Sequence, residues 1–175
     1  MTELRDKNGL TEDEFLRRYN GDKYPKPSVT ADIAVFRITD GVPELLLIKC
    51  GGHPFLGSWA LPGGFANKNE PLEKTAAREL MEETGITNAQ LELIGVYSEP
   101  GRDPRGWTVS AAYAAMLPEG AAAAAGDDAA DAQWFSLERV TDGSYCLSGQ
   151  AGRLAFDHDQ IVVDACAAVL KDHPA

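Results

Sequence analysis

The sequence predicts an α/β protein in which a mixed β-sheet is covered by α-helices. Runs rich in β-branched and apolar residues, typical of strands, are interleaved along the chain with two or three helical segments. The 175 residues suit one domain with a real core, and no internal repeat or linker stands out that would divide them. We therefore expect residues 1–28 to form an N-terminal extension with a short helix, and residues 29–175 to form the domain.

The first half of the chain gives the clearest local signals. Thr11 precedes Glu14 by three residues, the spacing of a capping box, which predicts the short helix of the extension. Two apolar runs within residues 29–50 flank a Thr-Asp-Gly-Val-Pro turn and predict a β-hairpin. A loop with glycine and proline follows, and residues 59–65 then read as a short strand that runs into a glycine turn.

The next helix is bounded by residues that favour its two ends. Pro71 suits the first turn, because proline there gives up only a donor that has no partner inside the helix. Gly85 suits the C-terminal cap. Further strands are predicted in residues 89–98, 107–117 and 132–137, a loop in the alanine-rich residues 118–131, and a C-terminal helix in residues 157–173, while residues 144–156 give no clear prediction.

The charge and composition of the chain argue against several classes of function. The formal net charge is −11, so no basic excess is available to neutralise nucleic-acid phosphates or an anionic membrane. The three cysteines are widely spaced and odd in number, which favours reduced thiols over a disulfide framework. Neither a signal peptide nor an apolar run of membrane-spanning length is present. We therefore expect a cytoplasmic protein that binds neither nucleic acid nor membrane.

Three glutamates of the predicted helix share one face. At about 100° per residue, Glu83 lies roughly 40° and Glu82 roughly 60° from Glu79. Like charges at these spacings destabilise a helix, and a helix C-terminus disfavours anions, so the cluster calls for a counter-charge. Three oxygen ligands suit a hard divalent cation such as Mg²⁺, Mn²⁺ or Ca²⁺, and no His or Cys nearby favours zinc. The alternative is a solvated helix face, which is the commoner origin of such clusters.

The residues around this cluster complete a longer pattern. Gly64 is followed after five residues by Glu70, and after seven more by Arg78-Glu79-Leu80; Glu82-Glu83 and Gly85-Ile86 follow, each after one further residue. Arg78 is placed to pair with Glu70 across the loop. The sequence resembles the Nudix hydrolases in every fixed position of their signature. That resemblance implies a Nudix fold, a mixed β-sheet sandwiched between α-helices, and hydrolysis of a nucleoside diphosphate linked to another moiety with Mg²⁺ or Mn²⁺.

The resemblance also implies roles for single residues. Glu79 and Glu83 look like the main metal ligands and Glu82 like a third or water-mediated one. The backbone carbonyl of Gly63 resembles another ligand. The remaining fixed positions look structural, namely Gly64, Glu70, Arg78 and Gly85.

The general base is less well defined. Many relatives carry an acid in a later loop, where this chain has Gly-Asp-Asp-Ala-Ala-Asp, and we favour Asp128 over Asp127 and Asp131. A merely solvated loop is the alternative reading, since nothing local predicts a shifted pKa. Glu82 and Glu99 are the other candidates.

A second stretch, Gly-Arg-Asp-Pro-Arg-Gly, bears on the substrate. Arg102 and Arg105 are suited to bidentate phosphate contact, and Asp103 to a ribose hydroxyl, unless the three pair among themselves. Phe55 is a candidate stacking surface for adenine. This stretch resembles Nudix enzymes of the ADP-ribose pyrophosphatase type, which implies conversion of ADP-ribose to AMP and ribose 5-phosphate.

Alternatives stay open. Within the enzyme class they are hydrolysis of other nucleotide sugars, of oxidised nucleoside triphosphates or of NADH. From another class, similar Nudix domains occur fused to a DNA-binding domain as ligand-sensing regulators. The chain ends after an acidic helix, and its signature is intact, which favours the enzyme. By analogy with the family, a homodimer is also expected.

Overall fold

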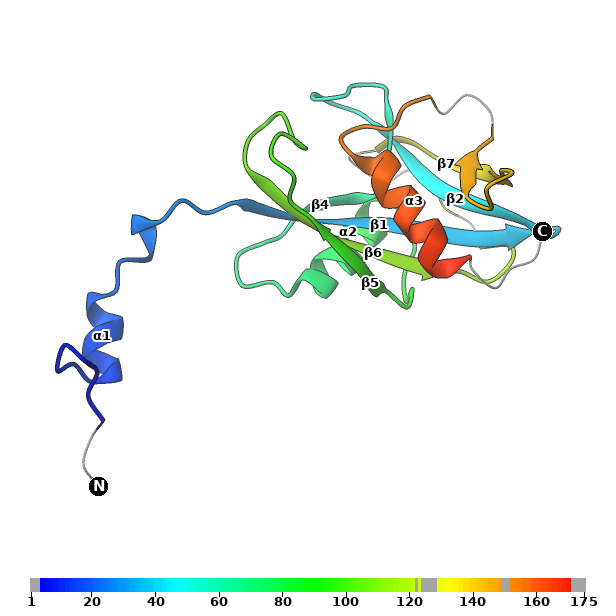
Figure 1. Ribbon diagram of the computed structural model, residues 1–175. Coiled ribbons are helices and arrows are strands. Elements are labelled where there is room, and N and C mark those ends of the chain that lie inside the picture. The colour runs from blue at the N-terminus through cyan, green and yellow to red at the C-terminus, as the bar shows by residue number, and fades with distance from the viewer. Residues whose placement is uncertain (1–3, 122, 124–128, 149–151, 171–175) are drawn as a thin grey trace.

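The computed structural model describes residues 4–121, 123, 129–148 and 152–170 (Figure 1). In chain order the elements are α1 (Glu12–Arg18), a 3₁₀ turn (Gly21–Lys23), β1 (Ser28–Thr39), β2 (Val42–Cys50), β3 (Trp59–Ala60), β4 (Gly63–Phe65), α2 (Leu72–Thr84), β5 (Glu92–Tyr97), β6 (Thr108–Met116), β7 (Ala129–Arg139), β8 (Tyr145–Leu147) and α3 (His158–Val169).

The strands form a mixed sheet in the order β5-β6-β1-β2-β7-β8. β1 runs parallel to β6, and the other neighbours along this path are antiparallel. The short strand β3 pairs with β2, and β4 pairs with β1. The predicted hairpin of residues 29–50 is confirmed, with its register running from Phe36 opposite Leu45 to Thr39 opposite Val42.

The two faces of β1 carry two separate cores. Ala34 and Phe36 pack with Ile161 and other residues of α3, whereas Ile33 and Val35 pack with Leu80 and the rest of the apolar stripe of α2. Successive side chains of a strand point to opposite faces, so this apolar run can be buried on both sides. The prediction of a mixed sheet between helices is thus confirmed, and Figure 1 shows α2 and α3 on either side of it.

The helix ends follow from their capping residues. Thr11 and Glu14 form the predicted capping box of α1. Pro71 lies one position earlier than predicted: it is the N-cap of α2, which begins at Leu72. Gly85 caps the C-terminus in the left-handed region, with φ of 71°, and its N–H donates to the carbonyl of Met81.

The strand β7 is longer than the sequence predicted. It begins at Ala129, inside the alanine-rich segment expected to be a loop, because pairing with β2 as far as Cys50 satisfies its backbone. Residues 144–156, which gave no clear prediction, contain β8. Residues 122 and 124–128 lie outside the described part of the chain.

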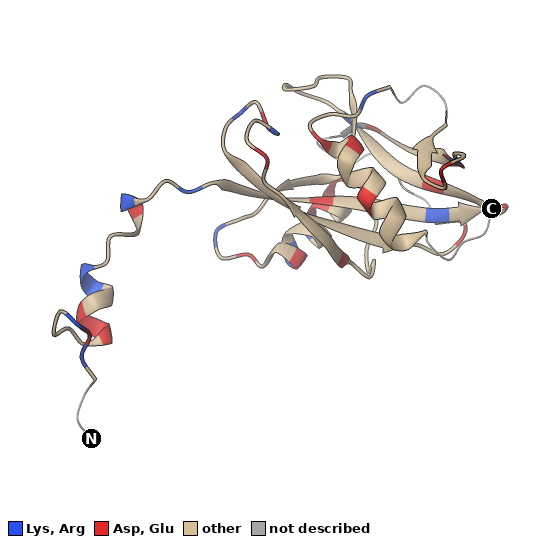
Figure 2. Ribbon diagram, in the orientation of Figure 1, with Lys and Arg blue, Asp and Glu red and all other residues tan. Residues whose placement is uncertain are grey.

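The extension and the charges are visible in the two overall views. Figure 1 shows α1 standing apart from the sheet, joined to β1 by an extended segment. Figure 2 shows acidic residues on α1, α2 and α3, with basic residues scattered among them. Among the described residues, no helix has both the length and the apolar character needed to cross a membrane.

Candidate active site

A hollow of about 430 Å³ lies where α2, the loop before β6 and the start of α3 come together. One wall is formed by Glu79 and Glu83 of α2 together with the Gly63–Gly64 backbone. The opposite wall and the floor bring together residues of β1, of the loop before β6 and of the chain around the start of α3, including Thr30, Asp32, Arg102, Asp103, Arg105, Phe156 and His158.

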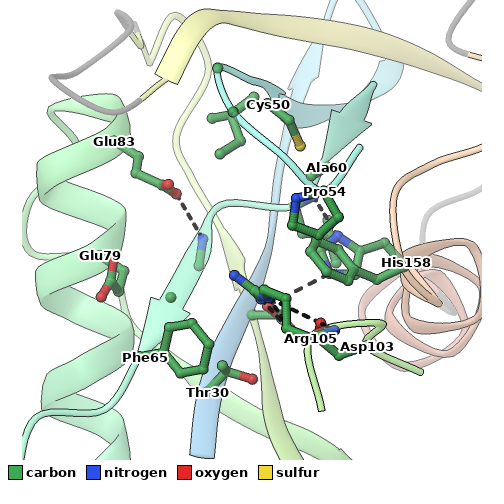
Figure 3. Close-up of a pocket in the computed structure, with 18 of the residues that line it drawn as sticks. Thr30, Cys50, Pro54, Ala60, Phe65, Glu79, Glu83, Asp103, Arg105 and His158 are labelled. Carbon is green, nitrogen blue, oxygen red and sulfur yellow. Dashed lines mark hydrogen bonds and ion pairs between the residues drawn. The ribbon is translucent and has the colours of Figure 1, made fainter. Parts of the chain in front are cut away.

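The α2 wall is built around two glycines. Figure 3 shows Glu79 and Glu83 projecting from α2 toward β4. The N–H of Gly63 donates to Oε2 of Glu83 at 2.8 Å. A Cβ at Gly64 would lie 2.5 Å from the Glu79 carboxylate, and one at Gly63 would overlap the carbonyl oxygen of Ala31. Glycine at both positions therefore lets the glutamates approach the backbone closely.

Arg78 holds this wall together. Its Nε and Nη2 donate to the two oxygens of Glu70 at 3.0 Å each, so the predicted pair is present. Arg78 also donates to the carbonyl of Phe65 at 3.0 Å, which ties β4 to α2. The hydrogen bonds from Arg78 and from the N–H of Asn67 lower the pKa of Glu70 from 4.5 to about 2.

The three glutamates of the cluster have different surroundings. Burial raises the pKa of Glu79, which also accepts a hydrogen bond from Nη1 of Arg78 at 2.6 Å. Glu83 lines the hollow beside it. The side chain of Glu82 is 49% exposed and accepts a hydrogen bond from Nη1 of Arg78 at 3.0 Å. Glu79 and Glu83 thus face the hollow, while Glu82 lies outside its lining.

This donor set suits a hard cation only in part. Within the described ranges, no three His, Cys, Asp or Glu side chains are close enough together to hold a metal ion. Two carboxylates nevertheless line the hollow next to the backbone of Gly63. Mg²⁺ is usually bound by one or two carboxylates with water and substrate phosphate as its other ligands. The chemistry of the residues present therefore fits such an ion when a phosphate substrate completes the site.

Arg102 belongs to a buried ion-pair network. Its side chain is 4% exposed, and it donates to both oxygens of Asp157, at 2.6 and 2.8 Å, and to Asp32 at 3.3 Å. Ser110 donates to the same Asp32 carboxylate. These bonds join the loop before β6 to β1 and to the N-terminus of α3, so the arginine fixes the shape of the hollow.

Arg105 is held by a carboxylate and two aromatic rings. Its Nε and Nη2 donate to Asp103, the nearest contacts being 3.0 and 2.7 Å, so these two residues pair as the alternative reading of the sequence allowed. The guanidinium lies 4.7 Å from the ring centre of Phe65 and 5.3 Å from that of Phe156. The side chain of Arg105 is 44% exposed, so it still faces the hollow.

His158 is a buried, neutral histidine of the floor. Its Nδ1 accepts a hydrogen bond from the N–H of Leu61 at 2.9 Å, so the ring is protonated at Nε2. That nitrogen lies 3.7 Å from Oδ1 of Asp32. Burial lowers the pKa of His158, although Asp32 acts in the opposite direction.

Not every predicted site residue lines this hollow. Phe55 and Glu99 line a second hollow of about 670 Å³, which shares Arg102 and Phe156 with the first. The rings of Phe55 and Phe156 are 4.7 Å apart. Asp131 is an exposed residue of β7, and Asp127 and Asp128 lie outside the described residues.

Sequence reasoning missed Asp32, Phe156 and His158. Asp32 carried a usable signal, because it is a charged residue between Ala31 and Ile33 in the apolar run of a predicted strand. Phe156 and His158 carried none, since their place in the site depends on how the end of the chain packs against β1 and the loop before β6.

A NUDIX domain family model matches residues 28–160, so the chain belongs to the Nudix family. The relatives that it resembles include both an enzyme and a regulator.

Two relatives bear on the function of this chain. The chain is 39% identical to an ADP-ribose pyrophosphatase of Methanocaldococcus jannaschii over 132 residues, 75% of this chain and 71% of the relative. It is 33% identical to the ADPR responsive transcriptional repressor NtrR of Acinetobacter baylyi over 162 residues. That match covers 91% of this chain but only 61% of the repressor.

Solved structures agree with this placement. A MutT/nudix family protein from Enterococcus faecalis superposes with a TM-score of 0.83 at 36% identity, over 93% of this chain and 70% of the other. The NUDIX domain of Shewanella oneidensis NrtR, solved in complex with ADP ribose, gives a TM-score of 0.77 at 31% identity, over 91% and 99%.

Proposed function

We propose that this Nudix hydrolase cleaves the diphosphate of ADP-ribose, giving AMP and ribose 5-phosphate, with Mg²⁺ or Mn²⁺. The observation that carries the proposal is the pair Glu79 and Glu83, packed on Gly63–Gly64 at one wall of a hollow whose other wall presents Arg105. The similarity to an ADP-ribose pyrophosphatase supports the choice of substrate.

In the proposed reaction, water attacks one phosphorus of the anhydride. The bond from that phosphorus to the bridging oxygen breaks, the oxygen leaves with the second phosphate, and a base accepts the proton of the water. Glu79, Glu83 and the carbonyl of Gly63 would hold the cation, with Glu82 as a direct or water-mediated ligand. A bound divalent ion neutralises phosphate charge and lowers the pKa of its water.

Asp128 stays our proposed base, with Asp127, Asp131, Glu82 and Glu99 as alternatives. The test is the dependence of kcat/KM on pH for each Asp→Asn or Glu→Gln variant. The variant of the true base loses the acidic limb of the profile. If Asp128→Asn keeps that limb, the base is one of the others.

The roles that we propose for the other site residues depend on how exposed their side chains are and on which groups already bind them. Arg105, half-exposed and fixed between two rings, suits contact with substrate oxygens, and Asp103 supports it. The guanidinium of Arg102 is already bonded to Asp32 and Asp157, so we assign it a positioning role. Phe55, beside Phe156, remains the proposed stacking surface for adenine.

A substrate panel tests the proposal. ADP-ribose, other nucleoside diphosphate sugars, NADH, dinucleoside polyphosphates and oxidised dGTP are compared by kcat/KM with Mg²⁺ and with Mn²⁺. We expect ADP-ribose to be preferred by more than about tenfold. A smaller preference would make the protein a broad diphosphatase.

The second candidate is an ADP-ribose-responsive regulator, favoured by the similarity to the Acinetobacter baylyi repressor. In that case ADP-ribose binds without turnover, and the protein binds promoter DNA at physiological salt. DNA binding together with an absence of ADP-ribose hydrolysis would replace the first proposal by the second.

A further inference from the structure

The hydroxyl of Thr30 is a buried polar group that lines the hollow and has no protein partner. Thr30 is 5% exposed, and its Oγ1 has no hydrogen-bond partner among the described residues. Buried hydroxyls nearly always have a partner, so an exception in the lining of a cavity points to a ligand. Among the described residues, the other buried side-chain atom in this condition, Nε1 of Trp134, does not line the hollow.

The register of the sheet places this hydroxyl beside the Arg105 stack. Thr30 lies opposite Phe65 of β4 and opposite Ser110 of β6, and paired residues of neighbouring strands share a face. Phe65 carries the guanidinium of Arg105 on its ring. Figure 3 shows Thr30 at the foot of the hollow, on the side of Phe65 and Arg105.

The charges around Thr30 indicate what kind of group it meets. Arg102 is paired with Asp32 and Asp157, and Arg105 is paired with Asp103. Three carboxylates therefore face two guanidiniums, and the floor has no surplus positive charge to attract a phosphate. A neutral group that both donates and accepts hydrogen bonds suits this environment, and Thr30 itself can do both.

We propose that the Thr30 hydroxyl hydrogen-bonds a sugar hydroxyl of the substrate and so contributes to selection of a ribose-bearing diphosphate. The inference rests on the proposed function, since it requires that the hollow accept a nucleoside diphosphate sugar. It makes a prediction that a structural role does not make. If the substrate is the partner of the Thr30 hydroxyl, this hydroxyl is unpaired in the free protein, where it lowers the free energy of unfolding. In the complex it forms a hydrogen bond, which raises the affinity of the protein for the ligand.

Thr30→Val tests this, because valine has nearly the same shape without the hydroxyl. We expect the melting temperature of the free protein to rise by roughly 2–4 °C, since a buried unpaired group is removed. We expect KM for ADP-ribose to rise about three- to tenfold with kcat within twofold, the loss of one neutral hydrogen bond. Inhibition by inorganic pyrophosphate, which has no sugar, should not change. Thr30→Ser should restore KM.

The matched control is Thr39→Val on the same strand. The hydroxyl of Thr39 donates to Oε2 of Glu44 at 2.8 Å and lies outside the hollow. This variant should lower the melting temperature and leave KM unchanged. Thr30→Val overturns the inference if it behaves like this control, or if it weakens ADP-ribose and pyrophosphate equally.

Calorimetric titration with ADP-ribose in the absence of metal, together with a separate hydrolysis assay with Mg²⁺ and with Mn²⁺, separates this inference from the proposed function. A wild-type protein that binds ADP-ribose in the titration but does not hydrolyse it with either metal disproves the proposed enzyme, yet weaker binding by Thr30→Val still supports the contact. A wild-type protein that hydrolyses ADP-ribose, and a Thr30→Val variant that binds it equally well, disprove the contact alone. A wild-type protein that neither binds nor hydrolyses ADP-ribose disproves both.

Discussion

On the α2 wall of the hollow, Arg78 is shared among Glu70, Glu79 and Glu82, whereas on the opposite wall Arg105 and Arg102 each have carboxylates of their own. The first wall therefore has one guanidinium for three carboxylates, whereas the second has two guanidiniums for three carboxylates. The larger excess of negative charge on the α2 wall suits a cation, which can in turn bind a phosphate. The more nearly neutralised opposite wall suits recognition of a substrate by shape, stacking and neutral hydrogen bonds. Variants on the two walls should accordingly fail in different ways.

The largest effect is expected on the α2 wall. Glu83→Gln should lower kcat by roughly a hundredfold or more, since the carboxylate charge proposed to hold the cation is lost. The amide oxygen still accepts the hydrogen bond from the N–H of Gly63, so the fold should persist. Steady-state kinetics with Mg²⁺ and a melting curve measure the two results.

Glu73→Gln is the matched control, because Glu73 is an exposed carboxylate of the same helix outside the hollow. It should leave kcat within twofold of the wild type. Wild-type turnover by Glu83→Gln would remove Glu83 from the metal-binding role.

The opposite wall should respond in stability. Arg102→Met leaves Asp32 and Asp157 without their partner in a buried setting, and we expect a loss of about 3 kcal/mol in the free energy of unfolding. Arg105→Met leaves the buried carboxylate of Asp103 with the backbone N–H of residue 105 as a remaining donor, so it should cost less, about 1–2 kcal/mol, and should also raise KM for ADP-ribose. Urea denaturation and kinetics on both variants check this difference. Equal stability losses would show that the two arginines are equivalent supports.

Gly63 and Gly64 lie on the same wall but should respond differently to substitution by alanine. Gly63→Ala brings its Cβ against the backbone of β1, which cannot move aside, so we expect a loss of about 2–4 kcal/mol. Gly64→Ala meets only the end of the Glu79 side chain, which can turn away. That variant should fold almost as well as the wild type but lose kcat, because Glu79 is displaced.

Thermal denaturation and kinetics on both alanine variants measure these outcomes. If Gly64→Ala retains wild-type kcat, the position of Glu79 against the backbone is not needed for turnover.

The same contrast explains what the sequence could predict. The α2 wall is local: Glu79, Glu82, Glu83 and their partner Arg78 lie within one helix, and their spacing alone places them together. The hairpin, the caps at Thr11 and Gly85 and the covering helices were predicted for the same reason. The opposite wall joins β1, the loop before β6 and the start of α3, segments separated by several dozen residues. Asp32, Phe156 and His158 meet only once the sheet has formed.

The start of β7 shows the same limit in the fold. Its first residues are alanine and aspartate, a composition that favours a loop, but the edge of β2 provides hydrogen-bonding partners that override the local preference. The pairing of Arg105 with Asp103 was within reach of the sequence, since they are two residues apart. The stacking of Arg105 between Phe65 and Phe156 was not.

The smallest effect that we predict is the pH dependence of the stability that Glu70 contributes. The pKa of Glu70 is lowered from 4.5 to about 2 in the folded protein, so its ionised form is favoured by folding. This contribution to stability is present above pH 4.5 and is lost as the pH falls from 4.5 toward 2. Glu70→Gln should be less stable than the wild type at pH 7, and the difference should shrink steadily as the pH falls through that window. Melting curves at pH 7, 5, 4 and 3 follow it.

Glu44→Gln is the control for kcat, because Glu44 also pairs with an arginine, Arg37, but lies outside the hollow and outside the motif. Neither substitution removes a residue that faces the substrate. Glu70→Gln should nevertheless lower kcat as well, because Arg78 then loses the carboxylate that orients it toward Phe65 and Glu79. Glu44→Gln should not. A Glu70→Gln variant with a stability deficit but unchanged kcat would show that the α2 wall holds Glu79 and Glu83 in place without help from the Arg78–Glu70 pair.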